Sequence, residues 1–266
     1  MKILKNTIRY RDQKTNILYF LPDADQELKA TFAIFTHGYT SDKSSIINWP
    51  IRLAEVGVPC ALFDLPGHYL GNYSEVTDFD HFKTNGHKLF LEAFNGLTEV
   101  FKEHSFDGAD LVESKKFKLV LGGHSLGAML SLKAMMLDEF NEMEKLAIGV
   151  GLGHAPTNAL HLFDTPFYKA TLNIREQLVS EALKPDHVFP WIRDEKAKIA
   201  LKNSRVHLIT GEDDLVVGND GMERLAATLE LNSNVVTMEK PSKLPHHEPQ
   251  LAASHVKKFL KKLNWI

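Results

Sequence analysis

The chain has 266 residues, of which 44% are hydrophobic and 24% charged; this length and hydrophobic content suffice for one sizeable core in a single domain. Its formal net charge of −3 does not favour binding to nucleic acid. No segment reaches the roughly 18 uncharged apolar residues that a membrane-spanning helix needs, and residues 1–11 lack the apolar core of a signal peptide. The single cysteine, Cys60, excludes an intramolecular disulfide and is typical of a reducing compartment, so a cytoplasmic protein without membrane or nucleic-acid partners is expected.

Alternating apolar and polar residues predict a β-hairpin at the amino terminus, with strands at 7–11 and 16–21. The almost purely apolar run 30–36 predicts a strand that is buried on both faces. Further along the chain, the same signals predict helices at 44–56, 80–103, 126–138, 221–231 and 248–263, and strands at 58–64, 117–121, 146–152, 205–210 and 234–239.

Strand and helix alternate along most of the chain, which predicts an α/β fold with a mostly parallel central sheet and helices on both faces. Residues 155–203 break the pattern, because they contain helix-like sequence and no convincing strand. Such an insertion would lie over the carboxyl edge of the sheet, where ligands bind in open α/β folds. We therefore expect one domain, with a core formed by 1–154 and 204–266 and a small helical lid formed by 155–203.

The segment 123–127, Gly-His-Ser-Leu-Gly, matches the pattern G-x-S-x-G. It follows an apolar strand directly and precedes a predicted helix, which is the context in which the pattern is informative. A sharp strand-to-helix turn strains the serine backbone, exposes the hydroxyl group and places it at the amino end of a helix. Ser125 is therefore the candidate nucleophile.

The serine turn and four further motifs, which occur in the family's order, make the chain resemble the α/β-hydrolase superfamily, as a serine esterase-like member with a short lid. The family has His-Gly after its third strand, matched by His37-Gly38, and D-x-P-G-H near the end of the fourth, matched by residues 64–68. The serine turn, a G-x-x-D segment and a late histidine follow. The family often continues P-G-H-G, and here Tyr69 replaces the last glycine, so the shape of this loop is expected to differ.

A serine hydroxyl needs a base to take its proton and a carboxylate to orient that base. The family order is serine, acid, histidine, and its G-x-x-D spacing favours Asp214 as the acid, with Asp213 as the alternative. The H-x-P spacing favours His247 as the base, with the adjacent His246 as the alternative.

The resemblance also implies an oxyanion hole formed by the backbone N–H groups of Tyr39 and Leu126. Gly38 is expected to let the main chain pass close to the substrate. Within the lid, the aromatic side chains of Phe163, Phe167 and Trp191 are candidates for lining an apolar pocket above the nucleophile.

We therefore expect an enzyme that hydrolyses esters of small or medium acyl chains through an acyl-serine intermediate, with a small-molecule substrate. A thioesterase, an acyltransferase or a hydrolase of carbon–carbon bonds would use the same residues, and a binding protein on this fold is a further alternative. No motif suggests a metal site or a dinucleotide-binding loop, so no cofactor is expected.

Overall fold

The computed structural model describes residues 1–104, 108–114, 116–155 and 166–266. Within these residues an eight-stranded sheet has the order β1-β2-β4-β3-β5-β6-β7-β8. The strands are β1 (Lys2–Tyr10), β2 (Gln13–Leu21), β3 (Thr31–Thr36), β4 (Cys60–Phe63), β5 (Lys118–His124), β6 (Glu144–Val150), β7 (Arg205–Ile209) and β8 (Val235–Glu239). β1 pairs antiparallel with β2 and β2 with β4, whereas all other pairs are parallel, so the predicted fold class is confirmed.

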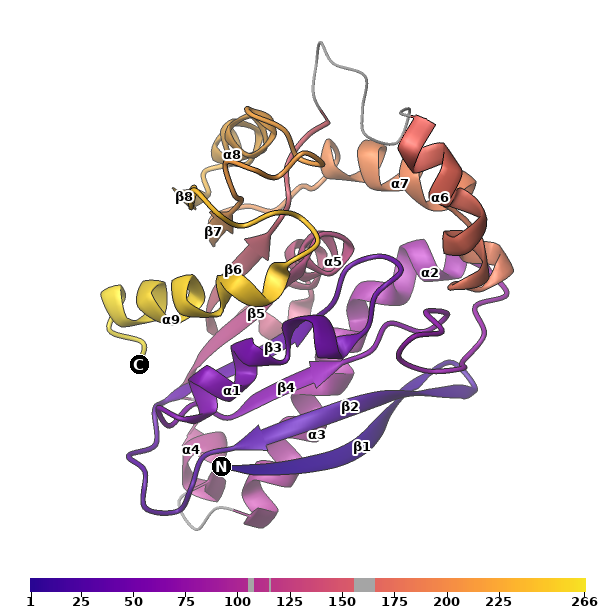
Figure 1. Cartoon of the computed structure of the whole chain (residues 1–266). Helices are drawn as coiled ribbons and strands as arrows, with labels where there is room; N and C mark the ends of the chain where they lie inside the picture. The colour runs from indigo at the N-terminus through magenta and orange to yellow at the C-terminus, as the bar shows by residue number, and fades with distance from the viewer. Residues whose placement is uncertain (105–107, 115, 156–165) are drawn as a thin grey trace.

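Helices connect the strands and form both outer layers (Figure 1). The α-helices are α1 (Asn48–Ala54), α2 (Phe79–Asn85), α3 (Leu89–His104), α4 (Gly108–Ser114), α5 (Leu126–Ala134), α6 (Pro166–Gln177), α7 (Pro185–Lys196), α8 (Gly221–Glu230) and α9 (Ala253–Lys262). Short 3₁₀ helices are η1 (Lys43–Ile46), η2 (Gly86–Lys88), η3 (Asp138–Phe140), η5 (Glu181–Leu183) and η6 (Pro249–Ala252).

Three predicted helices differ from the observed ones. The helix expected at 44–56 starts as η1, and the one expected at 248–263 starts as η6. The helix expected at 80–103 is interrupted at Gly86, where η2 separates α2 from α3. Sequence periodicity also missed α4, because its seven residues are too few to display a helical repeat.

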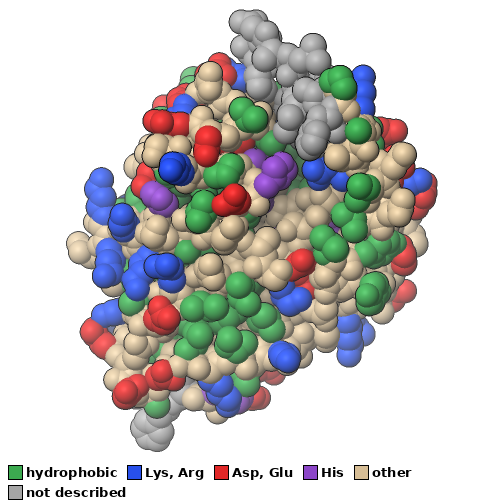
Figure 2. All heavy atoms as spheres, viewed as in Figure 1, with side chains coloured by type: hydrophobic (Ala, Val, Ile, Leu, Met, Phe, Trp, Pro, Cys, Tyr) green, Lys and Arg blue, Asp and Glu red, His purple; other side chains and the backbone are tan. Residues whose placement is uncertain are grey.

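The central strands of the sheet are buried on both faces, as strand β3 illustrates. Phe32 and Ile34 point into a cluster with α3, α5 and α8, whereas Ala33 and Phe35 point into a second cluster with α1 and α9. Successive side chains of a strand alternate between faces, so a strand covered on both sides is expected to be mainly apolar. The outer face of α9 is exposed, and Figure 2 shows basic side chains gathered over this helix.

Helices α6 and α7 belong to the stretch between β6 and β7, and they lie beyond the carboxyl ends of the central strands (Figure 1). Hydrogen bonds join this insertion to the core: the Tyr69 N–H donates to Leu178 O, and the Ser180 N–H donates to Gly67 O. Among the described residues, no helix is long and apolar enough to cross a membrane.

Candidate active site

Ser125 lies at the turn between β5 and α5. Its backbone has φ 50° and ψ −109°, a conformation that non-glycine residues rarely adopt and that clusters at functional sites. The flanking glycines permit this turn, because a Cβ atom at Gly123 or Gly127 would lie about 2.5–2.6 Å from backbone atoms. The strain predicted from G-x-S-x-G is therefore present, and the Ser125 side chain lines a cavity.

Asp214 follows β7 and is 3% exposed. Its Oδ1 accepts hydrogen bonds from the N–H groups of Val216 and Val217 at 2.9 and 3.0 Å, and its Oδ2 lies 2.9 Å from Nδ1 of His246. Burial by itself raises the pKa of Asp214, but the hydrogen bond and charge of His246 and the two backbone donors lower it below its ordinary value. A carboxylate held in this way stays ionised and can orient an imidazole.

The alternative carboxylate, Asp213, has a different partner. Its Oδ1 accepts a hydrogen bond from the Leu244 N–H at 2.8 Å, so it connects the turn after β7 to the loop that carries the two histidines. The preference for Asp214 as the acid that contacts a histidine therefore agrees with the geometry.

The histidine that contacts Asp214 is His246, and the sequence-based preference for His247 is wrong on this point. Both imidazoles line the cavity, yet their ring planes are almost perpendicular, at 88°. Adjacent residues of a loop direct their side chains differently, so one of them alone reaches the carboxylate. The H-x-P spacing could not reveal this, because a shift of one residue in the loop exchanges the two positions.

His124, the variable residue before Ser125, packs against His246 with ring centroids 4.7 Å apart. Burial, followed by the proximity of His246, His247 and His37, lowers the pKa of His124 well below its ordinary value. His124 is thus neutral near pH 7 and adds no positive charge beside His246. The sequence did not single out His124, although its place inside the motif predicts proximity to the site.

The loop after β3 approaches Ser125 closely. A Cβ atom at Gly38 would lie 2.6 Å from His124 Nδ1 and 3.4 Å from Ser125 Cβ, so glycine allows the main chain to pass close to the His124 ring. Tyr39 follows and lines the cavity, and Leu126 is the first residue of α5, where helical N–H groups have no partner within the helix. Both predicted oxyanion-hole residues therefore adjoin the nucleophile.

A buried charge pair holds the same loop. Asp64, at the end of β4, accepts a hydrogen bond from the Lys43 N–H at 2.8 Å and pairs with Lys43 Nζ at 2.5 Å. His37 accepts a hydrogen bond from the Leu65 N–H at Nε2, and its Nδ1 lies 2.8 Å from Gly38 O. Asp64 thus holds the loop and is not among the residues that line the cavity.

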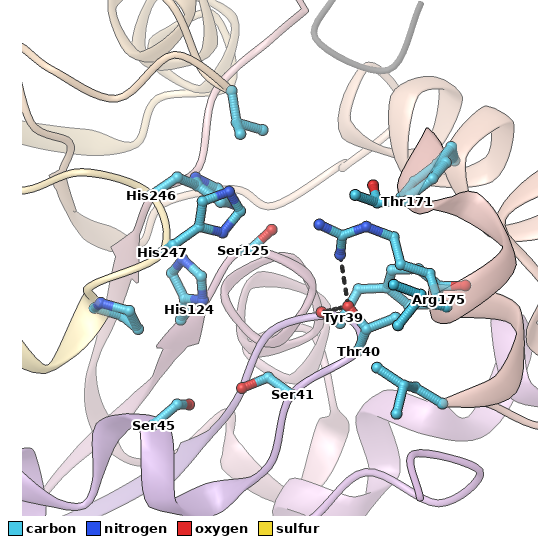
Figure 3. A pocket seen from close by; sticks show the side chains of 15 residues that line it. Tyr39, Thr40, Ser41, Ser45, His124, Ser125, Thr171, Arg175, His246 and His247 are labelled. Atoms are coloured by element: carbon cyan, nitrogen blue, oxygen red, sulfur yellow. Dashed lines mark hydrogen bonds between the residues drawn. The ribbon is translucent and has the colours of Figure 1, made fainter. Parts of the chain in front are cut away.

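The cavity above Ser125 has a volume of about 380 Å³ and is bounded by the serine turn, the loop after β3, the histidine pair and helix α6 (Figure 3). Helix α6 contributes the lining residues Thr171, Ile174 and Arg175, and Leu178 directly after the helix continues the same i, i+3, i+4, i+7 spacing. Sequence reasoning missed them because it selected aromatic residues. The i, i+3, i+4, i+7 pattern would have grouped them.

Among the expected aromatic lining residues, Trp191 does not line the cavity, whereas Phe189 of the same helix does. Trp191 is 8% exposed and packs edge-on against Phe79 and Phe82, at 5.7 and 6.0 Å between ring centroids. It attaches α7 to α2 and does not line the cavity. Phe163 and the side chain of Phe167 lie outside the described part of the chain.

No cluster of three or more His, Cys, Asp or Glu side chains that could hold a metal ion occurs within the described residues.

No protein-family model and no curated protein matches the sequence. Solved structures do match along almost the whole chain. Est1E from Butyrivibrio proteoclasticus has a TM-score of 0.58 at 16% identity, over 97% of this chain and 98% of its own. A soluble variant of monoglyceride lipase from Saccharomyces cerevisiae has a TM-score of 0.59 at 15% identity, over 97% and 94%. XC6422 from Xanthomonas campestris, described as an α/β serine hydrolase without lid, has a TM-score of 0.54 at 14% identity, over 97% and 94%. The chain therefore has the α/β-hydrolase fold.

Proposed function

We propose that the chain is a serine hydrolase that cleaves carboxylic esters of small or medium acyl chain through an acyl-serine intermediate. The observation that carries this proposal is the Asp214–His246 hydrogen bond beside the strained Ser125, with His246 and Ser125 lining one cavity. The names of similar structures, which include an esterase and a monoglyceride lipase, support a hydrolytic reaction.

In this mechanism His246 Nδ1 donates to Asp214, which leaves Nε2 as the acceptor for the Ser125 proton. The serine Oγ attacks the carbonyl carbon, and the N–H groups of Tyr39 and Leu126 stabilise the resulting oxyanion. The protonated His246 then gives its proton to the leaving alcohol as the C–O bond breaks. Water repeats the sequence on the acyl-serine, with His246 as base, and releases the carboxylic acid and free Ser125.

The insertion between β6 and β7 acts as a lid in this proposal. Tyr39 connects it to the oxyanion loop, because the Tyr39 hydroxyl donates to Leu183 O at 2.7 Å and its ring packs on Phe189 at 5.2 Å. A cavity of about 380 Å³ lies within the range of small-ligand sites, which favours small or medium acyl groups.

The direct test is Ser125→Ala. We expect the variant to fold normally and to lose activity by a factor on the order of 10⁴ or more. A fluorophosphonate should label the parent protein and leave the variant unlabelled. Ser41→Ala is a matched control, because Ser41 lines the same cavity and should leave labelling intact. Full labelling of Ser125→Ala would overturn the assignment.

The same triad would serve a thioesterase, an acyltransferase or a carbon–carbon bond hydrolase, and a binding protein would retain it without turnover. A panel of acyl esters and thioesters separates the catalytic alternatives. Burst kinetics with an activated ester separate a catalyst from a binding protein, because a burst requires an acyl-enzyme.

A further inference from the structure

His124 is a buried imidazole directly before the proposed nucleophile. Within the described residues neither of its ring nitrogens forms a hydrogen bond of ordinary geometry. Burying polar atoms in this way costs stability, and leucine, an apolar side chain of similar volume, would avoid that cost. The stability of the core therefore does not account for a histidine at this position, and its neighbours in the site have to be considered.

The flat ring of His124 adjoins two glycines. On the edge formed by Nδ1 and Cε1, a Cβ atom at Gly38 would lie at 2.6 and 3.2 Å. On the opposite edge, a Cβ atom at Gly151 would lie 3.1 Å from both Nε2 and Cδ2. The chain thus leaves a narrow space for this ring, between Gly151 and the loop that also contains Tyr39.

The ring of His124 also packs against the proposed base. The centroids of His124 and His246 are 4.7 Å apart, closer than the 5.8 Å between His246 and His247. In Figure 3 the three imidazoles lie together on one side of Ser125. The hydrogen bond between His246 Nδ1 and Asp214, at 2.9 Å, leaves the imidazole free to turn about that bond. A second contact is needed to direct Nε2 at Ser125, and the His124 ring supplies one.

We propose that His124 is a positioning residue whose ring holds the imidazole of His246 in the orientation in which Nε2 faces Ser125. This inference rests on the proposed serine-hydrolase function and adds a further side chain to its mechanism. His124 itself exchanges no proton, because burial, followed by the proximity of His246, His247 and His37, lowers its pKa well below the ordinary value. A neutral neighbour lets His246 take up the proton of Ser125 without facing a second positive charge.

A misdirected base has an effect that depends on the leaving group. During acylation His246 accepts the Ser125 proton and then protonates the departing oxygen. p-Nitrophenolate is stable enough to depart without a proton, whereas an alkoxide is not. Loss of the orientation of His246 therefore slows the cleavage of alkyl esters more than that of p-nitrophenyl esters. A defect in the oxyanion hole or in folding slows both to the same extent.

The test is His124→Leu, which keeps the volume of the side chain and removes the flat ring. We expect kcat/KM to fall about tenfold for p-nitrophenyl butyrate and about a hundredfold for ethyl butyrate. The free energy of unfolding in urea should stay equal or rise, because two buried nitrogens without hydrogen bonds are removed. His124→Met, whose unbranched side chain adapts to irregular spaces, gives the same result if leucine does not fit.

His207→Leu is the matched control, because it removes a buried histidine that does not line the cavity. This variant should leave the ratio of the two kcat/KM values unchanged, whatever its effect on stability. A change in the ratio as large as that in His124→Leu would show that the leaving-group effect is not specific to the neighbour of His246, and would overturn the proposal.

The remaining outcomes separate the positioning role from the proposed function. Equal losses on both esters in His124→Leu and His124→Met, or unchanged kcat/KM in both variants, would overturn the role of His124 alone. A loss of activity that follows a fall in the free energy of unfolding, at a constant ratio, would do the same. Hydrolysis of both esters that persists in Ser125→Ala would refute the proposed function itself.

Discussion

The imidazole rings of His124 and His246 lie 4.7 Å apart, at an interplanar angle of 54°. Gly151, with φ +61°, makes room for them, because a Cβ atom there would lie 3.1 Å from His124 Nε2 and from His246 Nδ1. The buried, neutral His124 thus packs against the ring that also contacts Asp214.

This packing predicts unequal roles for the adjacent histidines. His246→Ala should reduce kcat by a factor on the order of 10⁴, as expected for loss of a triad base. His247→Ala should reduce it far less, because His247 does not contact Asp214. Steady-state kinetics of both variants on one activated ester, with folding checked by circular dichroism, measure the difference. The reverse ranking would assign the base to His247.

The two carboxylates of the turn after β7 should also differ. Asp214→Asn keeps an oxygen for the Val216 and Val217 N–H groups but places an NH₂ group where His246 needs an acceptor. The imidazole then adopts the wrong tautomer, and kcat should fall by roughly 10⁴.

Asp213→Asn is the matched control, because an amide oxygen can still accept the hydrogen bond from Leu244. Its kcat should stay within about an order of magnitude of the parent value. A larger loss in Asp213→Asn than in Asp214→Asn would contradict the assignment of the acid.

Neutral esters should reveal the size of the cavity. Each buried methylene adds about 0.8 kcal/mol until the cavity of about 380 Å³ is filled, after which longer chains meet its walls. We expect kcat/KM for p-nitrophenyl esters, measured below their aggregation limits, to reach a maximum at short or medium acyl length. A steady rise to long chains, with activation at an oil–water interface, would rule this out.

Acid should destabilise the fold through two fully buried histidines. Burial lowers the pKa of His37 to about 4 and that of His68 to about 3, from 6.5. Both stay neutral in the folded chain while the unfolded chain takes up protons below pH 6.5. The free energy of unfolding therefore falls as pH decreases, by up to about 1.4 kcal/mol per pH unit for each group.

Urea denaturation between pH 7.5 and 4.5 measures this slope. His68→Asn should make the dependence shallower, whatever its effect on stability at pH 7.5, because the titrating group is gone. His104→Gln, at an exposed position, should leave the slope unchanged. An identical slope in the parent and His68→Asn would show that His68 does not cause the acid sensitivity.

Local sequence predicted the fold class and the candidate nucleophile. A strand such as β3, with four consecutive apolar residues at its centre, is expected to be buried on both faces, and G-x-S-x-G between a strand and a helix predicts the strained turn found at Ser125. These features depend on neighbours in the chain, so they can be recognised before any contact is known. Asp214 could be selected for the same reason, from its spacing after an apolar strand.

The tertiary structure alone decided which side chains meet. His246 and Asp214 are 32 residues apart, and which of two adjacent histidines reaches the carboxylate depends on a one-residue shift of a loop. Trp191 has the large aromatic side chain that is typical of ligand pockets, yet it packs against α2 and is buried away from the cavity. Arg175 is an ordinary charge on a helix until α6 is placed over the sheet edge and Thr40, 135 residues earlier, accepts its hydrogen bond. Such contacts are set by the packing of distant elements, which sequence periodicity does not encode.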